Sequence, residues 1–87
     1  MARYSLEIKR SAAREIADLP TKKDRRLVLE CISKLADDAR PPGAEKLVGN
    51  DRCRVRQGPY RIIYEVDDTA RVVCIVKIAH RREVYRQ

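Results

Sequence analysis

The sequence predicts a small α+β domain with the element order βααβββ. We expect the N-terminal strand and a helical hairpin to pack on a small, mainly antiparallel sheet. Residues 27–35 carry a single apolar stripe at helical spacing. Residues 60–66 are rich in β-forming side chains, and residues 71–78 are apolar on both faces, as in a strand inside a sheet. A chain of 87 residues has the length of one domain, so we expect a single domain spanning residues 1–87.

The first half of the chain contains a strand and two helices. Residues 4–9 alternate between apolar and polar side chains, which predicts a short strand. Ser11 is a suitable N-cap for a short helix, which Pro20 would end. Thr21, with Asp24 three positions later, forms an acidic variant of the capping box and predicts the start of the second helix. The short connection favours an antiparallel pair whose apolar face needs a sheet to cover it.

The second half supplies that sheet. Residues 53–57 alternate, and the turn residues at 57–59 separate them from the strand predicted over 60–66. A second turn over 67–70 leads into residues 71–78, which form the strongest predicted strand. Because that strand is apolar on both faces, we expect it at the centre of the sheet.

The charge balance points to an anionic partner. The chain holds 20 Lys and Arg against 13 Asp and Glu, a net charge of +7. Such a balance suggests nucleic acid, an acidic protein or an anionic membrane surface. No run of apolar residues is long enough for a transmembrane helix, and the first residues lack the apolar core of a signal peptide. We therefore expect a cytoplasmic protein with no role in a membrane.

The cysteines and the histidine argue against a metal centre. Cys31, Cys53 and Cys74 are far apart and show no CxxC spacing, and His80 is the single histidine. This pattern predicts neither a disulfide framework nor a zinc site. We expect no metal and no cofactor, with Cys31 and Cys74 as small buried side chains.

The arginines of the second half are placed to share one face. Side chains alternate along a strand, so Arg52, Arg54 and Arg56 point the same way. The turn at 57–59 would set Arg56 opposite Arg61 and Arg54 opposite Ile63. Like charges directly opposite each other destabilise a sheet, and guanidinium groups bind phosphate in a bidentate manner. We therefore predict a phosphate site, although a solvated strand face with dispersed arginines is an alternative.

The C-terminal residues add further candidates. Arg81 follows directly from the last predicted strand and would join the arginine face. The Tyr85 ring could stack on a base or pack over the sheet edge. His80 has an ordinary pKa near neutrality, but a solvent-facing histidine at a strand end is the commoner case.

Three segments resemble the RelE-type toxins of bacterial toxin–antitoxin pairs, within the wider RelE/ParE superfamily. These segments are Lys46-Leu47-Val48-Gly49, the run from Arg54 to Tyr64, and His80-Arg81-Arg82-Glu83-Val84-Tyr85. The resemblance covers nearly the whole chain. It implies a toxin that cleaves mRNA in the ribosomal A site by attack of the RNA 2′-hydroxyl on its own phosphate. It also implies a cognate antitoxin whose acidic segment wraps the toxin.

The resemblance assigns roles to particular residues. Arg54 and Arg56 match two basic strand positions, and Arg61 matches the arginine that orients the phosphate. Arg81 matches the arginine that protonates the leaving group, and Tyr85 matches the tyrosine that stacks on the substrate. We expect further RNA contacts from the remaining cationic candidates, which are Arg52, His80, Arg82 and Lys46.

The general base and the target stay open at this point. Arginine cannot accept a proton in a protein, so the base would be Tyr85, His80, Glu83 or a ribosomal group. The superfamily also contains ParE-type toxins, which poison DNA gyrase, and Arg81 with Tyr85 favours a RelE-like nuclease over these. A non-catalytic RNA-binding module is a third possibility.

Overall fold

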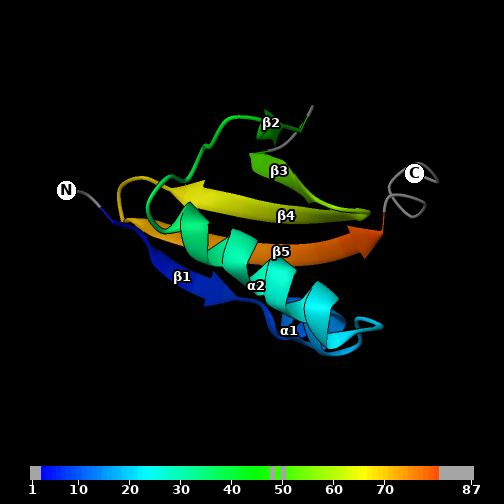
Figure 1. The fold of residues 1–87 in the computed structure, drawn as a ribbon. Coiled ribbons are helices and arrows are strands. Elements are labelled where there is room, and N and C mark those ends of the chain that lie inside the picture. Colours follow the sequence, from blue (N-terminus) through cyan, green and yellow to red (C-terminus); the bar gives the residue numbers. More distant parts are fainter. Residues whose placement is uncertain (1–2, 48, 50, 81–87) are drawn as a thin grey trace.

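The computed structural model describes residues 3–47, 49 and 51–80, and this part folds into two helices and a mixed sheet of five strands. The strand order is β1-β5-β4-β3-β2, with β1 parallel to β5 and the other neighbours antiparallel (Figure 1). The predicted α+β fold is confirmed, with one addition: the two-residue strand β2 was not predicted. The elements are β1 (Ser5–Ile8), α1 (Arg10–Ala17), α2 (Lys22–Leu35), β2 (Glu45–Lys46), β3 (Arg52–Gln57), β4 (Tyr60–Asp67) and β5 (Val72–His80).

The two helices begin in different ways. The Thr21 hydroxyl accepts a hydrogen bond from the Asp24 backbone N–H at 3.0 Å, so the predicted cap of α2 is confirmed. The prediction of Ser11 as the cap of α1 is wrong, because that helix starts at Arg10 with Lys9 as its N-cap and no side-chain cap bond. The Lys9 N–H donates to the Ile75 carbonyl at 3.0 Å. Pairing with β5 therefore continues to Lys9, and the helix starts directly after it.

The hairpin between β3 and β4 has the predicted register. Arg56 lies opposite Arg61, and Arg54 lies opposite Ile63. Gly58 in the turn has a φ of 59°, a left-handed conformation that glycine adopts without steric cost. The tight turn fixes which side chains of the two strands share a face.

The pairing of β5 is less regular. Ile63 lies opposite Lys77 and Tyr64 lies opposite Ile75, so Val76 is an extra residue on β5. This strand lies between β1 and β4, whereas β4 is the middle strand of the five. The expectation that residues 71–78 form the central strand is therefore wrong by one position. The strand is nevertheless flanked on both sides, which agrees with its apolar character.

One face of the sheet carries the hydrophobic core beneath the helices. α2 contributes Val28, Ile32 and Leu35, which pack with buried residues of β4 and β5. Tyr64 at the centre is fully buried, and its hydroxyl donates to the Ala39 carbonyl at 2.8 Å. We call this side the helix face and the opposite side the open face.

Neither helix of the described residues has the length and apolar character needed to span a membrane.

The cysteines lie differently from the prediction. Cys53 on β3 is buried on the helix face, whereas Cys31 and Cys74 are only partly buried. Residue 74 points to the open face because it pairs with Glu65. Among the described residues, no group of His, Cys, Asp or Glu could hold a metal ion.

Candidate nucleic-acid interface

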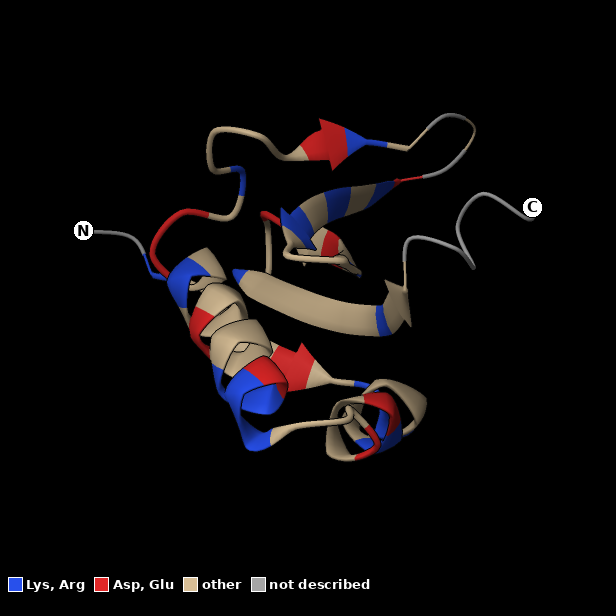
Figure 2. Ribbon diagram, turned by 45° about the vertical axis from the view of Figure 1, so that its right-hand side comes forward, with Lys and Arg blue, Asp and Glu red and all other residues tan. Residues whose placement is uncertain are grey.

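The basic residues of β3 lie on the open face of the sheet. Cys53 and Val55 point into the core, so the intervening arginines point to the other side. Figure 2 shows these basic residues spaced along β3. Their neighbours on the same face follow from the strand register. The open-face residues at this end of the sheet are Arg52, Arg54 and Arg56 of β3, Arg61, Ile63 and Glu65 of β4, and Lys77 and Ala79 of β5.

Arg56 and Arg61 form a like-charged cross-strand pair. Arg56 is exposed, and within the described chain it forms no ion pair. Arg61 is only 4% exposed, and its Nη1 has no hydrogen-bond partner among the described residues. A buried cationic donor without an acceptor is costly, because it has lost its water without gaining a partner. An anion between the two arginines would supply the missing acceptor.

The other two arginines of β3 are held by carboxylates. The Arg52 Nε lies 3.1 Å from Glu65 Oε2, and the Arg54 Nη2 lies 3.0 Å from Glu45 Oε2. Glu45 is opposite Arg54 on β2, and Glu65 is opposite Arg52 on β4. These cross-strand pairs neutralise the part of the arginine row farther from the turn. The charge available to an anion is therefore concentrated at Arg56 and Arg61.

Lys77 is a further cation on the open face. Its ammonium lies 3.5 Å from Glu15 Oε2 of α1. Together with Ile63 and Val76, these two residues line a hollow of about 350 Å³ between α1 and the β2–β3 side of the sheet. The hollow lies next to the arginine pair, because Ile63 is two positions from Arg61 on the same face.

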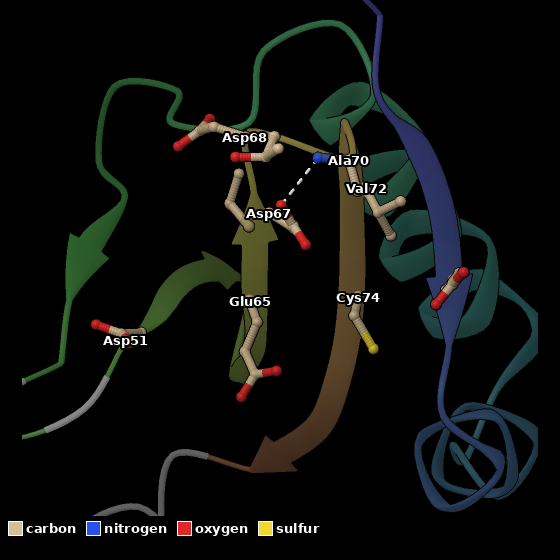
Figure 3. A pocket seen from close by; sticks show the side chains of 10 residues that line it. Asp51, Glu65, Asp67, Asp68, Ala70, Val72 and Cys74 are labelled. Atoms are coloured by element: carbon tan, nitrogen blue, oxygen red, sulfur yellow. Dashed lines mark hydrogen bonds between the residues drawn. The ribbon is translucent and has the colours of Figure 1, made fainter.

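The other end of the open face is acidic. A hollow of about 730 Å³ is lined by acidic residues of β1, of β4, of the turn that follows β4 and of the position just before β3. Figure 3 shows four of them, Asp51, Glu65, Asp67 and Asp68, around this hollow. The acidic residues are Glu7, Asp51, Glu65, Asp67 and Asp68. Several of these have partners of their own: Asp67 accepts from the Ala70 N–H at 2.9 Å, and Asp68 binds Arg40 and the Tyr4 hydroxyl. A polyanion would be repelled here, so the face has a basic end and an acidic end.

Two predicted site residues lie on the helix face instead. His80 is directly opposite Tyr60, and their rings make an edge-to-face contact with centroids 5.8 Å apart. The Tyr60 hydroxyl in turn donates to Asp24 at 3.1 Å. Lys46 lies opposite Cys53, so it points away from the arginine row. Neither residue is brought next to Arg56 or Arg61.

The sequence prediction missed several residues of the open face. Some of the site residues that it did name lie where the structure does not test them. Extending the predicted register by one pair would have placed Glu65 opposite Arg52. No comparable signal marked Glu45, because β2 has only two residues, or Lys77, because its position depends on the extra residue in β5. Arg81, Arg82, Glu83 and Tyr85 lie outside the described residues.

A family comparison identifies the class of protein. A family model described as "ParE toxin of type II toxin-antitoxin system, parDE" matches residues 6–85. No curated protein matches the chain. Because the family match covers nearly all of the sequence, the chain belongs to the ParE toxin family of type II toxin–antitoxin systems, within the RelE/ParE superfamily.

Solved structures show the same fold. RelE in the archaeal RelE–RelB complex from Pyrococcus horikoshii is 31% identical, with a TM-score of 0.81 over 93% of this chain and 97% of that chain. A mutant of the E. coli toxin RelE in complex with an antitoxin RelBc peptide is 27% identical, with a TM-score of 0.76 over 99% and 93%. The YoeB/ParE toxin from Agrobacterium tumefaciens is 13% identical, and its TM-score of 0.73 over 87% and 96% shows a shared fold. The resemblance to this superfamily is confirmed.

Proposed function

We propose that this toxin is a ribosome-dependent endoribonuclease that cleaves mRNA at the Arg56–Arg61 pair. The observation that carries the proposal is the cross-strand placement of two arginines without carboxylate partners in the described chain, one of them buried with an unsatisfied donor. The neighbouring cations are already neutralised by acids. A fold maintained for stability alone would not favour this arrangement.

The reaction fits guanidinium groups held on a rigid sheet. The 2′-hydroxyl of the RNA attacks the adjacent phosphorus, the bond to the 5′ oxygen breaks, and the products are a 2′,3′-cyclic phosphate and a free 5′-hydroxyl. Negative charge accumulates on the phosphoryl oxygens in the transition state. Fixed donors aimed at that charge stabilise it more than they stabilise the ground state. Arg61 would orient the phosphate, Arg56 would face it from the opposite strand, and Arg54 would contribute once released from Glu45.

The proton transfers must come from elsewhere. Arginine does not accept protons, and the His80 ring lies against Tyr60 on the helix face. We therefore assign the base to Tyr85, Glu83 or a ribosomal group, with Arg81 as the donor to the leaving 5′ oxygen. A base supplied by the ribosome would account for the proposed dependence of cleavage on ribosomes.

The biological setting follows from the same proposal. A ribosome-dependent toxin acts in the cytoplasm on A-site mRNA. Its relatives from Pyrococcus horikoshii and E. coli were solved with RelB antitoxin or an antitoxin peptide. A cognate antitoxin with an acidic segment would match the net charge of +7 and would cover the basic end of the open face.

Primer extension on a reporter mRNA in a reconstituted translation system tests the proposal. The wild type should produce cuts within codons that require ribosomes. Arg61→Ala should reduce the cleavage rate by about 100-fold or more, the usual cost of removing one transition-state donor. Arg56→Ala and Arg81→Ala should also be impaired. Arg26→Ala is the matched control, since it removes the same charge from the exposed surface of α2. Normal translation with intact mRNA would overturn the nuclease assignment.

Gyrase poisoning is the second candidate, because the matching family model is named for ParE toxins. That reading predicts intact mRNA and accumulation of cleaved DNA when the toxin is added to gyrase. Binding of RNA without either effect would instead identify a non-catalytic RNA-binding module. The same protein preparation can be taken through all three assays.

A further inference from the structure

Strand β5 is longer than its outer neighbour. β1 pairs with Val72–Ile75, and its last contact is the Lys9 N–H to the Ile75 carbonyl. The second half of β5 continues to His80, and α1 lies against it (Figure 1). An edge with no neighbouring strand leaves N–H groups that need another acceptor.

Glu15 of α1 supplies that acceptor. Its Oε1 accepts the Ile78 backbone N–H at 3.0 Å, while its Oε2 lies 3.5 Å from the Lys77 ammonium. One carboxylate thus holds both the backbone and a side chain at consecutive positions of β5. The helix that carries it is fixed in turn, because Ala12 and Ile16 are buried in the core. Within the described residues no strand pairs with this edge of β5 beyond Ile75, and Glu15 supplies an acceptor in place of one.

The held segment is the one that supports Arg61. Ala79, next to Ile78, is the direct partner of Arg61 on β4, and Lys77 is the partner of Ile63. The extra residue Val76 separates this segment from the regularly paired part of β5. The hydrogen bonds between β1 and β5 therefore end before the backbone segment that pairs with Arg61. The contact from Glu15 of α1 holds that segment instead.

We propose that Glu15 is a positioning residue for the Arg56–Arg61 site. By holding β5 at Ile78, it fixes the backbone beside Arg61 and so keeps that guanidinium opposite Arg56. By pairing with Lys77, it also keeps a neighbouring ammonium from competing for the phosphate. The part of this inference that concerns cleavage rests on the proposed nuclease function, whereas the part that concerns Arg61 does not.

Two substitutions separate the roles of the carboxylate. Glu15→Gln keeps an oxygen that can accept the Ile78 N–H but loses the charge that binds Lys77. Glu15→Ala loses both contacts. Asp18→Asn, at the exposed end of the same helix, controls for charge and helix stability. All variants are compared at a temperature where circular dichroism shows them fully folded.

The first readout is structural and does not need catalysis. Amide exchange measured by NMR should be faster at Ile78 and Ala79 in Glu15→Ala, and the Arg61 resonances should shift. Glu15→Gln should restore protection at Ile78. Unchanged Arg61 resonances in Glu15→Ala, or equal loss of protection in both variants, would overturn the proposal.

The second readout is kinetic, in the ribosome-dependent cleavage assay. Glu15→Ala should lower the maximal cleavage rate by about 10- to 100-fold, a typical cost of misplacing a catalytic group, with little change in the half-saturating ribosome concentration. Glu15→Gln should recover most of the rate. A rise only in the half-saturating concentration would contradict positioning. If the wild type cleaves no mRNA, the nuclease proposal fails, and the Arg61 resonances still decide the role of Glu15.

Discussion

Arg56 and Arg61 face each other directly across strands β3 and β4, and neither forms an ion pair with another described residue. Two positive charges in this position repel each other, and burial of Arg61 adds a desolvation cost. The fold tolerates this cost, which an anion bound between the two side chains would offset. Removing the buried charge of Arg61 should therefore change stability and function in opposite directions.

Arg61→Met should stabilise the free protein while it abolishes function. The substitution removes an unsatisfied buried donor and keeps much of the apolar volume of the side chain, so the free energy of unfolding should rise by about 1–3 kcal/mol. Cleavage should fall at the same time. Arg56→Met is the matched control: it should impair cleavage but change stability little, because Arg56 is exposed. Urea denaturation measures both variants, and a destabilised Arg61→Met would show that its guanidinium is well accommodated.

Glu45→Gln should strengthen RNA binding by releasing Arg54. The Arg54–Glu45 pair has its closest atoms 3.0 Å apart, and loss of the carboxylate charge leaves Arg54 free to contact a phosphate. One added phosphate contact steepens the dependence of log affinity on log salt by about 0.7 for single-stranded nucleic acid. Fluorescence anisotropy of a labelled RNA oligonucleotide across a salt series measures this slope. Glu30→Gln makes the same charge change beside Arg26 on α2 and should leave the slope unaltered.

The hairpin register was predictable because it depends on local features. A tight turn at Gly58 and alternation along both strands placed Arg56 opposite Arg61. The second helix was predictable for the same reason, since Thr21 and Asp24 mark its start within four residues. The burial of Arg61 was not predictable. The alternation of side chains along a strand places Arg61 on the face away from the core, but it does not say how exposed the side chain is there.

The residues around Arg61 that the sequence did not predict are placed by pairings between distant parts of the chain. β1 and β5 are parallel and far apart in the sequence, so their contact leaves no local pattern. The extra residue Val76 changes which side chains of β5 share a face with Arg61. It puts Lys77 on that face, which the sequence did not predict. Glu45 was missed because a two-residue strand carries no periodicity. The predicted arginine face therefore did not include the acids that pair with Arg52 and Arg54.

The cap of α2 offers a test of local stability. Thr21→Ala removes the acceptor for the Asp24 N–H, so the free energy of unfolding should fall by about 1 kcal/mol. Thr21→Ser keeps the hydroxyl and should stay within a few tenths of the wild type. Chemical denaturation compares the three proteins. Equal loss in both variants would indicate that the threonine methyl group matters more than its hydrogen bond.

Tyr64 should make the protein sensitive to alkali. Burial, together with a nearby Cys53, raises the pKa of Tyr64 from 10.0 to about 12. Between these values the unfolded chain has lost the phenolic proton and the folded chain still holds it, so stability falls as pH rises through this window. The full contribution is present below pH 10.0 and amounts to about 2–3 kcal/mol.

Tyr64→Phe isolates this effect from the other groups that titrate in alkali. The variant should be less stable than the wild type at neutral pH, because the Ala39 carbonyl loses its hydrogen bond. Its stability should then decline less steeply between pH 10 and 12, so the difference between the two proteins should narrow. Tyr60 and Tyr4, whose pKa values are also raised, titrate in both proteins and cancel in the comparison. If the unfolding free energies of the two proteins fell in parallel with pH, the buried phenol of Tyr64 would not be the cause of the loss of stability in alkali.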